Sequence, residues 1–145
     1  MDKYALVSGQ IKAGAVNRHG WVFAPANFAI KSGSAPMLLE HSQDNNIIFN
    51  RAAQWTIDNS GLTIRHWLGL ARHPERAIYD RVCEGRLHFS FGRGRSVAAS
   101  QAAVARTMKV KPLTRPRTSS LPVEHVSYVL RPSYHQEPAR IIKVI

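Results

Sequence analysis

Residues 51–68, RAAQWTIDNSGLTIRHWL, decide the fold of this chain. Apolar and polar side chains alternate along 51–57 and again along 62–68, which is the period of strands with one buried face. The four residues between these runs, DNSG at 58–61, all tolerate the backbone of a tight turn. The stretch therefore predicts a β-hairpin.

Further strand and helix patterns extend outward from this hairpin. Pro74, followed by Glu75, predicts the start of a helix that runs to Val82, with Gly85 as its C-terminal cap. A second, alanine-rich helix is expected at 96–108. Short strands are expected at 4–13, 20–24, 37–41, 47–49, 86–91, 123–130 and 140–145. The pattern is mainly β with added helices, an α+β fold, and its simplest architecture is a small closed or nearly closed β-barrel.

The composition indicates one globular domain over residues 1–145 with a strongly basic charge. Twenty Lys and Arg against nine Asp and Glu give a net charge of +11, which favours acidic partners such as nucleic acid or anionic protein surfaces. Part of this charge lies in a proline-rich segment at about 109–122, which predicts a loop. The segment has no aromatic residues to stack on bases, so specific nucleic-acid recognition is not expected.

Three features of the sequence bear on its compartment. Cys83 is the single cysteine, so no intrachain disulfide can form, and a buried structural thiol in a reducing compartment is expected. No apolar run approaches the ~20 residues of a membrane span. The first ten residues, MDKYALVSGQ, lack the architecture of a signal peptide. A cytosolic protein without membrane contact is expected.

Ser90 and His41 are the candidates for nucleophilic catalysis. A serine nucleophile needs a base within hydrogen-bond reach and donors for the developing oxyanion. Ser90 lies in the strand pattern FSFG, two residues before Gly92, and His41 closes the run MLLEH. Taken alone, these residues also fit a surface serine and a polar or core histidine.

His88 is a competing base, because alternation places it on the same strand face as Ser90. Residues two apart on one strand lie ~7 Å from each other, which is too far for a direct hydrogen bond. No spacing of cysteine and histidine matches a zinc site. No metal or cofactor is therefore expected.

Five short motifs occur in order along residues 17–133. They are GWVFAP at 20–25 with Phe28, PMLLEH at 36–41, DNSGL at 58–62, Gly85 followed by SFG at 90–92, and VSYV at 126–129 with Pro132. In these motifs the chain resembles the tailed-phage prohead protease family, which is distantly similar to the herpesvirus assembly proteases. The resemblance covers most of the chain and implies a herpesvirus-protease-like β-barrel ringed by one to three helices.

The resemblance also implies a role for each candidate residue. Ser90 would be the nucleophile and His41 the general base, with Gly92 as the candidate position for the oxyanion hole. The third member would be His125, which stands where the family often has an acidic residue. Glu124 is the alternative third member, and alternation puts it on the opposite strand face, so it would need a one-residue slip or a bulge.

The function that the resemblance implies is a serine endopeptidase of phage procapsid maturation. Its substrates would be scaffold and major capsid proteins, with self-cleavage as a further reaction, inside the procapsid in the host cytoplasm. Arg93 after the serine motif and His125 in place of an acidic residue depart from the family pattern, which leaves open a catalytically inactive protease-fold protein of capsid assembly. A small basic nucleic-acid-binding module is a third reading. Cleavage specificity, self-processing sites and the oligomeric state, a homo-oligomer included, stay open.

Overall fold

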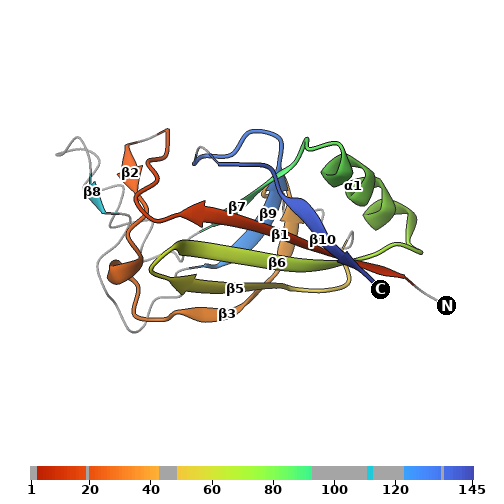
Figure 1. The fold of residues 1–145 in the computed structure, drawn as a ribbon, viewed down its shortest axis with the longest axis horizontal. Coiled ribbons are helices and arrows are strands. Elements are labelled where there is room, and N and C mark those ends of the chain that lie inside the picture. The colour runs from red at the N-terminus through yellow and green to blue at the C-terminus, as the bar shows by residue number, and fades with distance from the viewer. Residues whose placement is uncertain (1–2, 19, 43–48, 93–110, 113–122, 135) are drawn as a thin grey trace.

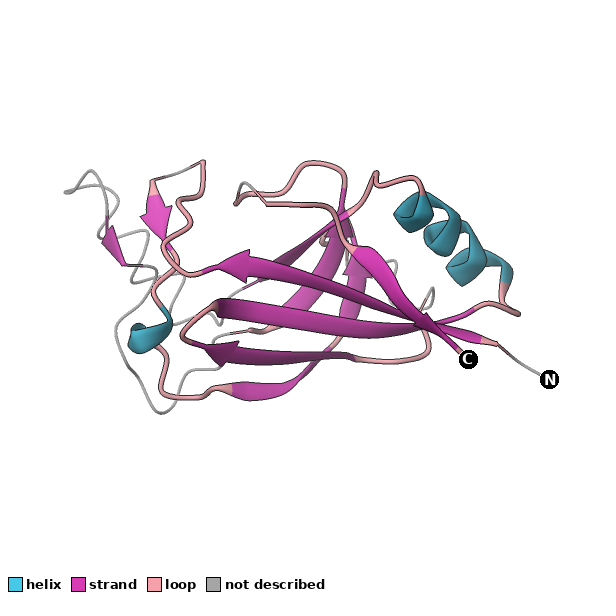
Figure 2. Ribbon diagram, in the orientation of Figure 1, coloured by secondary structure: helices cyan, strands magenta, loops and turns pink. Residues whose placement is uncertain are grey.

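The computed structural model of the 145-residue chain describes residues 3–18, 20–42, 49–92, 111–112, 123–134 and 136–145. In this part of the chain, ten strands and one α-helix follow each other along the sequence (Figure 1, Figure 2). The expected α+β class, mainly β with an added helix, is therefore confirmed at this coarse level.

The larger sheet has five antiparallel strands in the order β10-β1-β6-β5-β3. Its strands are β1 (Tyr4–Lys12), β3 (Ser32–Ala35), β5 (Ala53–Asp58), β6 (Gly61–Gly69) and β10 (Arg140–Val144). β5 and β6 form the predicted hairpin, with Asp58 opposite Gly61. The Asp58 carboxylate accepts the Ser60 amide at 2.8 Å, and Gly61 has a φ of 138°, which a residue with a Cβ avoids. The turn chemistry thus agrees with the sequence pattern.

The smaller sheet has three strands in the order β4-β9-β7 and carries the candidate site. β4 (Met37–Leu39) runs parallel to β9 (His125–Val129), and β7 (His88–Gly92) runs antiparallel to β9. Pro36, which has no amide hydrogen to donate to a ladder, marks the point where the chain leaves the larger sheet after β3 and enters the smaller one. The two sheets are linked by the Ala139 amide, which bonds the Leu87 carbonyl at 2.9 Å.

One helix and two short strands complete the described fold. α1 (His73–Cys83) matches the expected helix, with Pro74 in its first turn and Gly85 in the left-handed conformation after its end. Figure 1 shows α1 at the same end of the molecule as both termini. β2 (Trp21–Val22) and β8 (Lys111–Pro112) form a parallel pair, and a 3-10 turn spans Pro25–Asn27.

The core lies between the two sheets, and a glycine allows them to approach closely. The ring of Phe89 on β7 packs on the backbone of β1 at Gly9, where an added Cβ would lie 2.6 Å from the ring. Trp55 of the larger sheet and Tyr128 of the smaller sheet are among the largest fully buried side chains. Packed aromatic residues therefore fix one face of the smaller sheet, and its other face carries Ser90 and Ser127 beside the buried Leu38.

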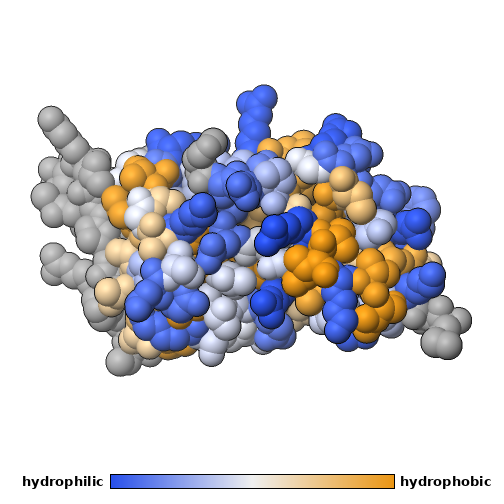
Figure 3. Space-filling model, viewed as in Figure 1, coloured by the Kyte–Doolittle hydropathy of each residue, from blue (hydrophilic) through white to orange (hydrophobic). Residues whose placement is uncertain are grey.

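The surface seen in Figure 3 is mostly polar, with apolar side chains gathered toward the end that carries both termini. The exposed large apolar residues include Ile142, Val144 and Ile145.

Cys83 is exposed, so the prediction of a buried thiol at this position is wrong. The buried stripe of α1 runs through Ile78 and Val82, and the next position along the helix turns outward. No helix of the described chain is long and apolar enough to cross a bilayer.

No closed barrel is found in the described residues, where one helix, α1, is present of the one to three that were expected around it. The larger sheet ends at β10 and β3, and the smaller sheet forms ladders of its own. A barrel needs each strand to pair on both sides, whereas here the chain crosses between two sheets at Pro36. The second expected helix, at 96–108, lies outside the described residues, as do most of the expected 109–122 loop and most of the strand expected at 47–49.

Candidate active site

Ser90 lies in the middle of β7 and faces away from the core. Its neighbours Phe89 and Phe91 are buried on the opposite face of the strand. The antiparallel register pairs Ser90 with Ser127 of β9. Ser90 is only 6% exposed, so its hydroxyl is held against neighbouring residues rather than in open solvent.

His41 comes from a tight turn that follows β4. The Ser42 amide bonds the Leu39 carbonyl at 3.0 Å, and the two central residues, Glu40 and His41, have φ values of 52° and 60°. Positive φ at both central positions is the pattern of a type I′ turn, which usually contains asparagine or glycine. The turn directs the imidazole toward β7, where Ser90 Oγ lies 3.0 Å from His41 Nε2.

His125 contacts the other side of the His41 ring from the start of β9. Its Nε2 lies 2.7 Å from His41 Nδ1, and the two rings meet at 73° with their centroids 5.0 Å apart. Gly92 is the register partner of His125, and a Cβ added at Gly92 would overlap the His125 ring. The glycine therefore provides the space in which the second imidazole lies.

These contacts form one continuous chain from Ser90 through His41 to His125. For His41 Nε2 to accept the Ser90 hydroxyl proton, His41 must carry its own proton on Nδ1. This Nδ1–H group then donates to His125 Nε2, so His125 carries its proton on Nδ1. We assign these tautomers from the hydrogen-bond pattern. In this arrangement His41 can act as a base toward Ser90, and His125 can fix the orientation of its ring.

Both imidazoles are held toward their neutral forms. Burial lowers the pKa of His41, the neighbouring His125 lowers it further, and the carboxylate of Glu40 opposes both effects. Burial also lowers the pKa of His125, against the opposing charge of Glu124. A base must be unprotonated to accept a proton, so these pKa shifts favour the competent state at neutral pH.

Two other candidate residues, Glu124 and His88, are not part of this series of hydrogen bonds. Glu124 is exposed, and its amide rather than its carboxylate makes the contact to β7, at 2.7 Å from the Gly92 carbonyl. His88 lies at the opposite end of β7 from Gly92, paired with Val129, and its buried Nδ1 has no hydrogen-bond partner within the described residues. Neither the Glu124 carboxylate nor the His88 ring is hydrogen-bonded to His41 in the described part of the chain.

Gly92 is also the candidate position for the oxyanion hole. Its carbonyl accepts the Glu124 amide, and its missing side chain makes room for His125. Residues 93–110, which follow it, lie outside the described residues. The oxyanion role of this position therefore stays a prediction.

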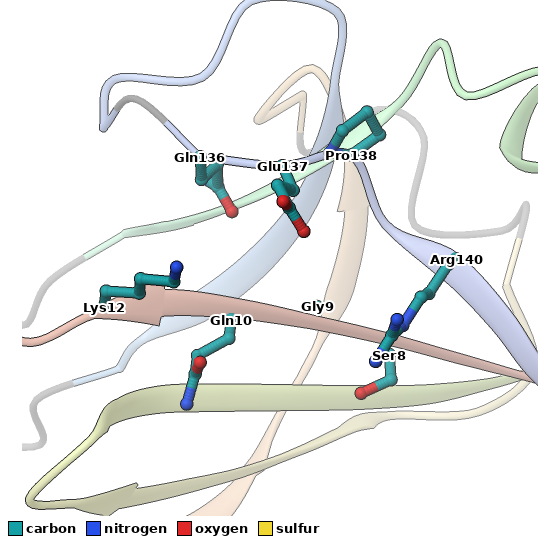
Figure 4. A pocket seen from close by; sticks show the side chains of 8 residues that line it. All are labelled: Ser8, Gly9, Gln10, Lys12, Gln136, Glu137, Pro138 and Arg140. Carbon is teal, nitrogen blue, oxygen red and sulfur yellow. The ribbon is translucent and has the colours of Figure 1, made fainter.

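A cavity of about 410 Å³ lies next to β7 but does not include the candidate catalytic residues. It is lined by β1 and the segment that leads into β10, namely Ser8, Gly9, Gln10, Lys12, Gln136, Glu137, Pro138 and Arg140 (Figure 4). The Gln136 side chain donates from Nε2 to the Phe89 carbonyl at 2.8 Å. The cavity thus adjoins the backbone of the Ser90 strand, but Phe89 faces the core there and Ser90 faces the opposite side.

Sequence reasoning missed the groups that support His41. The Ser127 hydroxyl accepts the His41 amide at 2.8 Å, and the Glu40 carboxylate accepts the Leu130 amide at 2.8 Å. Neither Ser127 nor Glu40 has a role in the sequence prediction. Alternation along β9 places Ser127 on the same face as His125, and this is the signal that points to it.

In the described part of the chain, no group of three or more His, Cys, Asp or Glu side chains is arranged to hold a metal ion. A scan against protein-family models, a search of curated proteins and a search of solved structures each give no match for this chain. What the chain does is therefore inferred from the geometry around Ser90 and from the motifs of its sequence.

Proposed function

We propose that this protein is a serine endopeptidase in which Ser90 is the nucleophile, His41 the general base and His125 the residue that orients the base. The observation that carries this proposal is the unbroken hydrogen-bond chain, with 3.0 Å from Ser90 Oγ to His41 Nε2 and 2.7 Å from His41 Nδ1 to His125 Nε2. The three side chains come from separate segments and meet in the geometry that activation of a serine requires.

The proposed reaction is acyl transfer in two halves. Ser90 Oγ attacks a peptide carbonyl while its proton moves to His41 Nε2, and the His41 cation donates its Nδ1–H to neutral His125. The tetrahedral intermediate then collapses, the C–N bond breaks, and His41 gives the proton to the departing amine. Water attacks the acyl-serine with His41 as base, the carboxylic acid product leaves, and Ser90 regains its proton.

A histidine as third member stabilises the His41 cation less than a carboxylate would. Neutral His125 offers a lone pair but no negative charge, so the hydrogen bond lacks the charge assistance of an aspartate. We therefore expect a lower turnover than an aspartate in this position would give. A low turnover suits an enzyme that meets its substrates at high local concentration within an assembly.

The resemblance to prohead proteases supports a substrate class. We propose that the enzyme cleaves scaffold and major capsid proteins inside a phage procapsid in the host cytoplasm, and that it also cleaves itself. The net charge of +11 favours contact with acidic protein surfaces. We also propose that the strands around Ser90 are a variant of the herpesvirus-protease-like fold, and that backbone amides near Gly92 bind the oxyanion.

A fluorophosphonate probe tests the nucleophile without a known substrate. Wild-type protein is expected to be labelled on the peptide that contains Ser90, and the Ser90→Ala and His41→Ala variants are expected to lose this label. The matched control is Ser34→Ala, which changes an exposed serine on β3 and is expected to label like wild type. Labelling that persists at another serine in the Ser90→Ala variant would overturn the assignment.

Co-expression with the cognate scaffold and capsid proteins tests the substrate class. Mass spectrometry is expected to find cleaved products with wild type and none with Ser90→Ala. Cleavage that persists with Ser90→Ala rejects Ser90 as the nucleophile. A folded wild-type protein that neither takes the probe nor cleaves would replace the enzyme proposal with the inactive capsid-assembly protein.

A further inference from the structure

The turn that carries His41 has a backbone conformation that its residues do not favour. Glu40 and His41 are the two non-glycine residues with positive φ in the described chain. Left-handed backbone is disfavoured for residues with a Cβ, and type I′ turns usually contain asparagine or glycine. Such a turn persists only where surrounding contacts hold it.

Three hydrogen bonds to β9 and the residue after it hold this turn. The Glu40 amide bonds the Tyr128 carbonyl at 2.9 Å. The Glu40 carboxylate accepts the Leu130 amide at 2.8 Å. The His41 amide bonds Ser127 Oγ at 2.8 Å. The first two bonds anchor Glu40, and the third anchors the backbone of His41 itself.

Ser127 is placed to fix the position of the base, His41, relative to the nucleophile, Ser90. It is fully buried, and the register of β7 and β9 sets it directly opposite Ser90. Its hydroxyl accepts the His41 amide and donates to the Tyr128 carbonyl at 3.3 Å. Both bonds need a hydroxyl, and together they connect the partner strand of Ser90 to the backbone of His41.

We propose that Ser127 is the positioning residue of the general base, with Glu40 as a second anchor of the same turn. This inference rests on the proposed function of Ser90 and His41, and it adds the residue that fixes their separation. Without the Ser127 hydroxyl, the His41 amide loses its acceptor and the turn is free to relax toward ordinary backbone angles. The imidazole then moves away from Ser90, while β7 and β9 stay paired.

Two pairs of variants test this role through the rate of fluorophosphonate labelling. Ser127→Ala is expected to label roughly 100-fold more slowly than wild type, because a displacement of about 1 Å at a catalytic group costs on this order. Ser127→Thr keeps the hydroxyl and is expected to recover most of the rate. If either Ser127 variant fails to fold, two variants of Glu40 still test whether the turn positions His41. Glu40→Ala is expected to slow labelling roughly tenfold, whereas Glu40→Gln keeps an Oε1 acceptor and is expected to recover most of the rate at pH values above the pKa of His41, where the lost charge no longer affects the protonation of the base.

The pH profile separates positioning from a merely structural role. Wild-type labelling is expected to rise with pH through the lowered pKa of His41. In Ser127→Ala the midpoint is expected to move up toward the ordinary histidine value, because the ring loses the partial burial and the neighbouring His125 that lower its pKa, and these effects outweigh the opposing charge of Glu40. A merely structural role lowers the amount of folded protein and leaves this midpoint where it is.

Hydrogen exchange at the His41 amide tests the same inference without any activity. Exchange measured by NMR is expected to be at least ~10-fold faster in Ser127→Ala than in wild type, with the amides of β7 unchanged. If wild type takes no probe, the endopeptidase proposal fails, and this measurement still decides on the turn. Wild-type exchange at His41 in Ser127→Ala, or a wild-type labelling rate and pH midpoint, overturns the inference.

Discussion

The two faces of the smaller sheet each hold a histidine beside a hydroxyl, yet only one of the two pairs is suited to react. On one face, His41 Nε2 lies 3.0 Å from Ser90 Oγ. On the other, His66 Nδ1 lies 2.8 Å from the Tyr128 hydroxyl. The distances are alike, so distance alone does not make a catalytic pair.

The difference lies in the second nitrogen of each imidazole and in access to water. His66 is fully buried, and its Nε2 donates to the Arg51 carbonyl at 3.0 Å. Burial lowers the pKa of His66 to about 4 and raises that of Tyr128 well above its ordinary value, so neither group changes protonation near neutral pH. His41 is exposed, and its second nitrogen faces another titratable ring, His125. Both imidazoles have an acceptor at the second nitrogen, so the reactive pair is distinguished by a path for substrate and by groups that can change protonation near neutral pH.

Among the variants that test this comparison, Gly92→Ala is expected to have the largest effect on the rate of labelling. The added Cβ overlaps the ring of His125 and displaces it, so His41 loses the group that fixes its tautomer. We expect the labelling rate to fall by about 10³-fold, which is ~4 kcal/mol of activation free energy, because loss of a third member costs on this order. Circular dichroism and thermal unfolding would show that the fold remains.

A double-mutant cycle distinguishes this role of Gly92 from an oxyanion role. In a His125→Ala background the space beside Gly92 is empty, so Gly92→Ala is expected to cost almost nothing further. If Gly92→Ala costs the same in both backgrounds, the glycine acts independently of His125. That result would favour the predicted oxyanion contact instead.

The buried pair is expected to act on stability rather than on activity. The pKa of His66 falls from 6.5 in the unfolded chain to about 4 in the folded chain. The unfolded chain therefore takes up the proton first as the pH falls. The stability contributed by neutral His66 is complete above pH 6.5 and is lost toward pH 4, and it amounts to about 3 kcal/mol. Denaturant unfolding at several pH values is expected to show this loss in wild type and not in His66→Gln.

Tyr128→Phe is the matched control for this prediction. It removes the hydroxyl that faces His66 Nδ1 and is expected to destabilise the protein by about 1–3 kcal/mol at all pH values. His66 remains buried in that variant, so most of the pH dependence should remain as well. An equal slope in wild type and His66→Gln would show that other groups cause the acid sensitivity.

The sequence predicts the strands of the two sheets better than it predicts the turn that carries His41. Alternation placed β5, β6, β7 and β9 close to their observed bounds, because each has one buried face with a period of two. Alternation and the motif order also marked Ser90, His41 and His125, which the structure brings together. These features depend on local pattern, and local pattern is what a single sequence contains.

The features that escaped prediction depend on contacts between distant segments. Glu40 and His41 contain neither the glycine nor the asparagine that marks a type I′ turn, and the turn is held by a strand more than 80 residues away, since Ser127 contacts His41 across 86 positions. The division into two sheets at Pro36 likewise follows from pairing with β9. The sequence pattern favours a barrel because strand count alone does not give strand order.

The smallest effect on the rate of labelling is expected from Glu124→Gln. This variant tests whether Glu124 or His125 is the third member. Glu124 is exposed, and its contact to β7 uses the backbone, so removing the charge leaves the chain from Ser90 to His125 in place. The charge raises the pKa of His125 against the effect of burial, and its loss only favours the neutral imidazole further. We expect the labelling rate to change by less than about threefold, below ~1 kcal/mol, whereas His125→Ala should lose about 10³-fold. The reverse ranking of these two variants would make Glu124 the third member and would mean that β9 shifts by one residue in the working enzyme.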